Sequence, residues 1–122
     1  MPPRMPIPKT RSSALTMTGN DANVRLDLNN PVFQDNLLTL QKPERHAALD
    51  TLHKIRQLTW NQLYRDSGIK WERITSIKPP LGVDAIYSLR ITQSRRATAY
   101  RDGDFIRLLT IAHDHDATYG KK

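Results

Sequence analysis

The spacing of the hydrophobic residues changes at Gly68, and this change restricts the folds open to the chain. Between Pro43 and about Gln57, apolar residues recur at intervals of three and four, which is typical of a helix with one buried face. They are Ala48, Leu49, Leu52, Ile55 and Leu58. After Gly68 apolar and polar residues alternate, which predicts strands. The order of elements therefore indicates the α+β class.

Shorter patterns predict the other elements. Alternation around Val24, Leu26 and Leu28 predicts a strand, and an Asn before Pro31 predicts the cap and first residue of a helix over 32–40. A further helical turn around Trp60 is predicted to end at Gly68. Strands are predicted over 70–76, 86–92, 97–101 and 105–112, with a hairpin at Asp102-Gly103. We expect an N-terminal strand and helices packed on a C-terminal antiparallel sheet of about four strands.

The length of 122 residues fits one domain. Residues 1–22 are rich in proline and lack periodic hydrophobicity, so we expect a flexible N-terminal arm there and a single α+β domain over 23–120. Nothing in the sequence matches a signal peptide or a membrane span, so we expect a cytoplasmic protein. The absence of cysteine excludes disulfides, thiolate nucleophiles and cysteine-based zinc sites.

The chain is strongly basic. Nineteen Lys and Arg residues against twelve Asp and Glu residues give a formal net charge of +7. Such a charge favours polyanions through phosphate contacts and counterion release, so nucleic acid is the leading class of partner. A small basic domain without a polyanionic partner is the simpler alternative.

Two arginines in the predicted sheet are candidates for phosphate binding. Strand alternation places Ser88 and Arg90 on one face, and antiparallel pairing brings Arg96 near Arg90. Two guanidinium groups on one face would hold a phosphate bidentately. The alternative is that each arginine pairs with Asp84, Asp104 or another acid of the chain.

The C-terminal segment carries groups that transfer protons near neutral pH. Its sequence is His113-Asp114-His115-Asp116-Ala117-Thr118-Tyr119. Imidazole is a general acid or base, and the tyrosine hydroxyl donates a proton or orients a phosphate oxygen. Two His alternating with two Asp also match metal ligands, although no third well-placed ligand accompanies them. A plain polar tail is the third interpretation.

Together these groups fit RNA cleavage without a metal or cofactor. RNA supplies its own nucleophile, the 2′-hydroxyl. A base must remove its proton, cations must stabilise the phosphate, and an acid must protonate the departing 5′ oxygen.

The last third of the chain resembles the RelE/ParE superfamily of bacterial type II toxins. The resemblance follows the order of elements over roughly residues 24–120. Its motifs are Tyr87-Ser88-Leu89-Arg90-Ile91, Arg96 before the strand that ends in Tyr100-Arg101, Asp102-Gly103-Asp104, and Ile111-Ala112-His113-Asp114-His115-Asp116 with Tyr119. The resemblance implies a ribosome-dependent endoribonuclease that cuts mRNA, inhibits translation and is restrained by a cognate antitoxin protein. It implies no membrane partner and no small-molecule cofactor.

The resemblance also assigns roles to residues. Arg90 and Arg96 correspond to phosphate-binding arginines, His113 or His115 to the C-terminal acid or base, and Tyr119 to the terminal catalytic or stacking tyrosine. The general base stays open between Glu72, Asp84 and a histidine, because the loop before the Arg-bearing strand differs from the family pattern. RNA-binding cations are expected at Lys70, Arg73, Lys78, Arg95 and Arg101.

Two other functions fit the sequence. One is a ParE-like inhibitor that acts on DNA gyrase through protein contacts. The other is an RNA-binding module that does not cleave its ligand.

Overall fold

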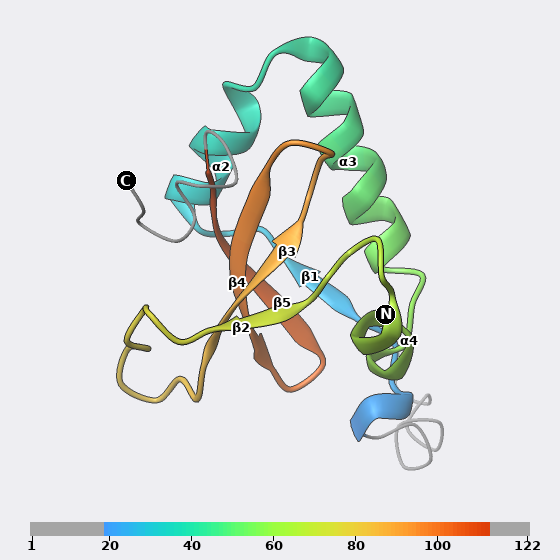
Figure 1. Cartoon of the computed structure of the whole chain (residues 1–122), viewed down its shortest axis with the longest axis vertical. Helices are drawn as coiled ribbons and strands as arrows, with labels where there is room; N and C mark the ends of the chain where they lie inside the picture. Colours follow the sequence, from blue (N-terminus) through green and yellow to red (C-terminus); the bar gives the residue numbers. More distant parts are fainter. Residues whose placement is uncertain (1–18, 113–122) are drawn as a thin grey trace, which may run out of the picture.

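The described part of the chain, residues 19–112 of a computed structural model, contains one mixed sheet of five strands (Figure 1). They are β1 (Arg25–Asp27), β2 (Glu72–Ile74), β3 (Ile86–Arg90), β4 (Arg96–Asp102) and β5 (Phe105–Ile111), in the spatial order β1-β5-β4-β3-β2. Strand β1 is parallel to β5, and the other neighbours are antiparallel. The α+β class is therefore confirmed.

The expected number of about four strands is wrong for the described residues, because the N-terminal strand joins the sheet. Leu26 lies opposite Ile106, and the Arg25 N–H donates to the Asp104 carbonyl at 2.9 Å. Strand β1 thereby covers the outer edge of β5, whose backbone groups would otherwise lack partners.

The helices begin where the sequence provides caps. The helix α2 (Pro31–Leu38) follows Asn30, whose side chain accepts hydrogen bonds from the Val32 and Phe33 N–H groups at 2.8 and 3.3 Å. The helix α4 (Trp60–Arg65) follows a capping box formed by Thr59 and Gln62. Between them lies α3 (Lys42–Ile55). The cap and proline expected at the start of α2 are both present.

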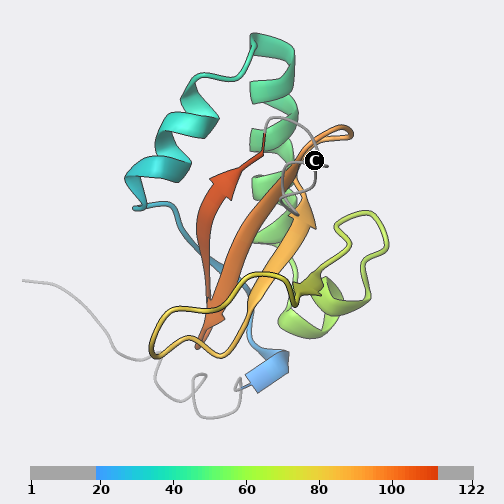
Figure 2. The same cartoon turned by 60° about the vertical axis from the view of Figure 1, so that its left-hand side comes forward.

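One face of the sheet packs against the helices (Figure 2). The core joins the helix residues Phe33, Leu37, Ala48, Leu52, Ile55, Trp60 and Leu63 to the strand residues Leu89, Ala97, Ala99, Ile106, Leu108 and Ile111. Leu49 was expected in this core, but it is 47% exposed. It lies one residue, or about 100°, from Ala48 around the helix, which turns it away from the sheet.

Two strands are shorter than the alternation indicates. The predicted strand 70–76 contracts to β2: Lys70 has a φ of 55° and breaks the extended backbone before it, and the chain bends at residues 75–77 after it. Strand β3 ends at Arg90, where the Ile91 N–H donates to the Arg95 carbonyl and closes a turn. The hairpin between β4 and β5 forms as expected, with Gly103 at a φ of 63°.

The second face of the sheet is not covered by the helices described. The segment between β2 and β3 crosses in front of part of it in Figure 2. None of the helices in residues 19–112 is long and apolar enough to cross a membrane. Of the expected N-terminal arm, residues 1–18 lie outside the described range, and the Ala22 carbonyl accepts a hydrogen bond from the Trp60 N–H.

Candidate nucleic-acid interface

Arg90 and Arg96 lie directly opposite each other on β3 and β4. Opposed residues of an antiparallel pair project from the same face with their Cβ atoms about 4.5–5.5 Å apart, so the two positive side chains leave the sheet side by side. The expected approach of the two arginines is therefore confirmed. Arg90 is exposed, whereas Arg96 is only 7% exposed. Like charges in this position repel, and an anion between them would relieve that repulsion.

Hydrogen bonds to neighbouring segments hold the Arg96 side chain in place. Its Nη2 donates to the buried Ser88 Oγ at 2.9 Å and approaches Glu72 Oε1 and the Lys70 carbonyl, each at 3.4 Å. An acid other than Asp84 or Asp104 thus pairs with Arg96, as the simpler interpretation allowed. For the Arg90 side chain, the structure of residues 19–112 records no ion pair.

The arginine pair lines a pocket of about 310 Å³ at this end of the sheet. Its lining residues are Lys70, Glu72, Arg90, Gln93, Ser94, Arg95 and Arg96. Four of these side chains are basic and one is acidic. Glu44, which is not among the lining residues, pairs with Arg95. Four cations therefore stand against the two carboxylates of Glu72 and Glu44, which leaves an excess of two positive charges. We call this site the arginine pocket.

The turn beside the arginine pocket is fastened to α3. Glu44 accepts hydrogen bonds from Arg95 Nε, from Ser94 Oγ at 2.8 Å and from Thr92 Oγ1 at 3.3 Å. Arg95 and then Ser94 therefore hold the pKa of the Glu44 carboxyl below its ordinary value. Arg95 Nη1 also donates to the Ala112 carbonyl at 3.2 Å. This turn positions the pocket wall.

Lys70 reaches the pocket through an unusual backbone conformation. Its φ of 55° lies in the left-handed region, which costs a residue other than glycine about 1 kcal/mol or more. The conformation brings the chain back toward β3, where the Arg90 N–H donates to the Ile69 carbonyl at 2.7 Å. The exposed Lys70 side chain thereby joins the lining of the arginine pocket.

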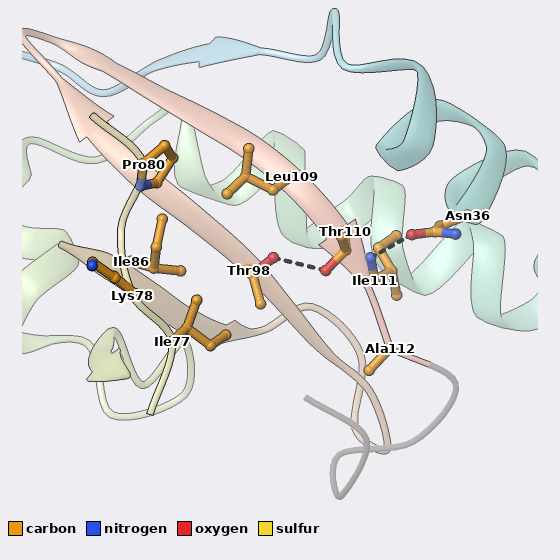
Figure 3. Close-up of a pocket in the computed structure, with 10 residues that line it drawn as sticks. All are labelled: Asn36, Ile77, Lys78, Pro80, Ile86, Thr98, Leu109, Thr110, Ile111 and Ala112. Carbon is orange, nitrogen blue, oxygen red and sulfur yellow. Dashed lines mark hydrogen bonds between the residues drawn. The ribbon is translucent and has the colours of Figure 1, made fainter. Parts of the chain in front are cut away.

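A second hollow, larger at about 550 Å³, lies beside β4 and β5 (Figure 3). Thr98 lies two residues after Arg96 on β4, so the two side chains share a face. Thr98 Oγ1 and Thr110 Oγ1 are hydrogen-bonded at 2.7 Å. The described residues that line it are Asn36, Ile77, Lys78, Pro80, Ile86, Thr98, Leu109, Thr110, Ile111 and Ala112. We call this site the threonine hollow.

The predicted RNA-binding residues are therefore divided. Lys70 and Arg95 line the arginine pocket, and Lys78 lines the threonine hollow. Arg73 lies on β2 opposite Tyr87. Arg101 lies on the helix side, 4.2 Å from the Trp60 ring centroid, and donates to Tyr64 Oη at 2.8 Å.

The candidates for proton transfer are divided as well. Glu72 lies in the arginine pocket, whereas Asp84 lies two residues before the start of β3 and is not among the described residues that line the pocket. His113, His115 and Tyr119 lie outside the described residues. The Ala112 N–H donates to the Arg96 carbonyl at 2.9 Å, so the last described residue lies beside the arginine pair. Between residues 19 and 112, no group of three His, Cys, Asp or Glu residues is arranged to hold a metal ion.

The sequence patterns did not predict the residues that hold the two sites in place. Glu44 contacts a turn about fifty residues further along the chain, and no local pattern connects the two. One indication of a role for Ser88 was present in the sequence, because a small polar residue interrupts the apolar run of β3. Nothing in the sequence indicated a role for Thr98 and Thr110, because threonine is common in strands.

No protein-family model matches the chain, and comparisons with curated proteins and with solved structures return no match.

Proposed function

We propose that the chain is a ribosome-dependent mRNA endoribonuclease of the RelE/ParE toxin kind, restrained by a cognate antitoxin. The observation that carries the proposal is the direct cross-strand placement of Arg90 and Arg96 at a pocket with an excess of positive charge. A phosphodiester matches both the charge and the forked geometry of two guanidinium groups. The resemblance of the last third of the chain to these toxins adds the substrate and the partner.

Two cations of the pocket support the proposed 2′-hydroxyl attack. Arg96 is fixed by Ser88, and Arg90 faces solvent, so a phosphate would enter between a rigid and a movable cation. Their charge would stabilise the crowded phosphate as the 2′-oxygen bonds to phosphorus. The products are a 2′,3′-cyclic phosphate and a 5′-hydroxyl, formed when the bond from phosphorus to the 5′ oxygen breaks.

Two proton transfers complete the step. Glu72 is the base that this geometry favours, since its carboxylate lies in the pocket and its side chain is 51% exposed. It would accept the 2′-hydroxyl proton. His113 or His115, which follow Ala112 in the sequence, would protonate the departing 5′ oxygen, and Tyr119 would orient the phosphate.

One observation favours a second candidate, an RNA-binding module without cleavage. The carboxylate of Glu72 lies 3.4 Å from Arg96 Nη2. This ion pair occupies one of the two carboxylate oxygens that would otherwise accept the 2′-hydroxyl proton. If this ion pair persists when RNA is bound, the pocket would bind phosphate without removing the 2′-hydroxyl proton.

The test is controlled expression in a bacterial host, with growth measurement and mapping of new mRNA 5′ ends. The wild-type chain should arrest growth and cut translated mRNA. Arg90→Ala should reduce cutting by about 100-fold or more, because one charge-stabilising group is lost. Arg56→Ala, which removes the same charge from the end of α3, should cut normally.

Three results would contradict the proposal. Growth arrest without new mRNA ends but with lost DNA supercoiling would indicate a gyrase inhibitor. RNA binding without cutting or arrest would indicate a non-catalytic module. Equal cutting by the wild type and Arg90→Ala would remove the arginine pair from the site.

A further inference from the structure

We propose that the threonine hollow binds one nucleobase of the RNA whose phosphate lies in the arginine pocket. This inference depends on the RNA binding assumed in the proposed function, but not on cleavage. It adds a site that reads or holds a base, whereas the arginine pair contacts only the backbone.

The position of the hollow is the first argument. Arg96 and Thr98 are neighbours on one face of β4, about 7 Å apart along the strand. On β3 the lining residue Ile86 shares this face with Ser88, which holds Arg96. Lining residues of both sites thus follow one strip of the shared face of β3 and β4, and a nucleotide can span their spacing of about 7 Å from its phosphate to its base.

The size and lining of the hollow are the second argument. A volume of about 550 Å³ lies within the range of about 300–1,000 Å³ that small-ligand sites have. Ile77, Pro80 and Leu109 offer apolar walls for the faces of a flat ring (Figure 3). Apolar walls with a few convergent polar groups are typical of sites for such ligands.

The threonine pair is the third argument. Two hydroxyls carry two protons and four lone pairs, and their mutual hydrogen bond uses one of each. One proton and further lone pairs are left for the polar edge of a base. The pair lies next to the shift in register between Thr98 and Ala99, where Leu109 is the extra residue of a bulge. Bulges often re-aim side chains near functional sites.

Charge selects RNA over an apolar protein segment as the occupant. Among the lining residues that the structure describes, Lys78 is basic and none is acidic, and the described side chains of the arginine pocket have an excess of two positive charges. The whole chain has a formal net charge of +7. A polyanion is attracted along the whole strip, whereas an uncharged side chain would use only the apolar walls.

The test measures binding, so that it does not depend on cleavage. Fluorescence anisotropy compares a labelled single-stranded 2′-O-methyl RNA hexamer, which cannot be cut at its 2′ positions, with an abasic oligomer of equal phosphate number. The wild-type chain should bind the base-bearing hexamer about fivefold or more tightly than the abasic one, as contacts to single bases generally provide. Thr110→Val should reduce this preference and leave the abasic affinity unchanged.

The control is Thr51→Val, which makes the same chemical change on α3. It should keep the full preference. Crosslinking of the wild-type chain to a hexamer with one 4-thiouridine is the second measurement, and it needs no variant to fold. Crosslinks to the lining of the hollow, at residues 77–86 or 109–112, at Asn36 or at Thr98, support the proposal, and crosslinks confined to other residues overturn it.

Equal affinity for the base-bearing and abasic oligomers would also overturn the proposal, and would leave the hollow to a protein side chain. A base preference that Thr110→Val reduces, in a chain that never cuts mRNA, would support the hollow while refuting the endoribonuclease. The two proposals can therefore fail separately.

Discussion

Arg96 Nη2 donates a hydrogen bond to Ser88 Oγ at 2.9 Å, and both side chains are buried. The hydroxyl thereby holds one end of the guanidinium of Arg96, a residue that lines the arginine pocket. A buried charge needs such partners, because it has lost its hydration. The arrangement couples the stability of the sheet to the geometry of the proposed site, since the same side chain serves both.

Replacement of this hydroxyl should therefore destabilise the fold. Ser88→Ala should lower the free energy of unfolding by about 1.5–3 kcal/mol, the range for hydrogen bonds to charged groups. Urea denaturation followed by circular dichroism measures the change. Ser76→Ala, in the exposed segment between β2 and β3, is the control and should be neutral. A neutral Ser88→Ala would mean that other contacts hold Arg96.

The contact between Glu44 and Arg95 should control the order of the turn after β3. Glu44→Gln keeps the shape of the side chain but removes the charge that binds Arg95, Ser94 and Thr92. We expect faster hydrogen exchange at the Arg95 amide, which donates to Thr92 Oγ1 at 3.0 Å. Glu44→Gln should also weaken RNA binding, because the turn forms part of the wall of the arginine pocket. Unchanged exchange in Glu44→Gln would show that the turn orders itself.

Asp27 should make part of the stability depend on pH. The Asn29 N–H donates to its carboxylate at 2.9 Å and Arg107 pairs with it, so the pKa of Asp27 lies below its ordinary value. A lowered pKa in the folded state stabilises the fold above the unfolded pKa, and this contribution is lost as the pH falls through the folded pKa.

Asp27→Asn should accordingly reduce the difference in unfolding free energy between about pH 6 and about pH 3. Urea denaturation at both pH values measures this difference. Asp35→Asn, which changes an exposed carboxylate on α2, is the matched control. An equal pH dependence in wild type and Asp27→Asn would contradict the prediction.

Arg101 is expected to matter more for folding than for RNA. Its guanidinium lies over the Trp60 ring, and it donates to Tyr64 Oη, to Asn20 Oδ1 at 2.6 Å and to the Gly103 carbonyl. Arg101→Ala should lower the free energy of unfolding by about 1–2 kcal/mol. RNA affinity, measured by anisotropy, should fall less than it does for Arg90→Ala. If RNA affinity falls more for Arg101→Ala than for Arg90→Ala, Arg101 binds RNA, as the sequence predicted.

The sequence patterns predicted those features that local spacing determines. The alternation in 86–91 places Arg90 and Ser88 on one face, and Asp102-Gly103 forms a hairpin, because strand pleating and turn chemistry act over a few residues. The register of Arg90 against Arg96 followed from the short turn between them. The geometry of the site could therefore be predicted from the sequence where residues close in the sequence form it.

Contacts between distant segments were not accessible in this way. The parallel addition of β1 to β5 joins residues about eighty positions apart, and nothing in the three residues of β1 specifies that edge. Lys70 entered the left-handed region although its residue type disfavours it, so the predicted strand over 70–76 was too long. Tertiary packing decided both outcomes.

The salt dependence of RNA binding gives the most direct count of phosphate contacts. For single strands, the slope of log affinity against log salt concentration changes by about 0.7 for each phosphate neutralised. Arg90→Ala should therefore make this slope shallower by about 0.7. Arg56→Ala, which removes a charge at the end of α3, should leave it unchanged. Anisotropy titrations over a series of salt concentrations measure both slopes. Equal slopes for the two variants would mean that Arg90 contributes only to the general field of the protein, because a residue that binds a phosphate releases counterions that a distant charge does not.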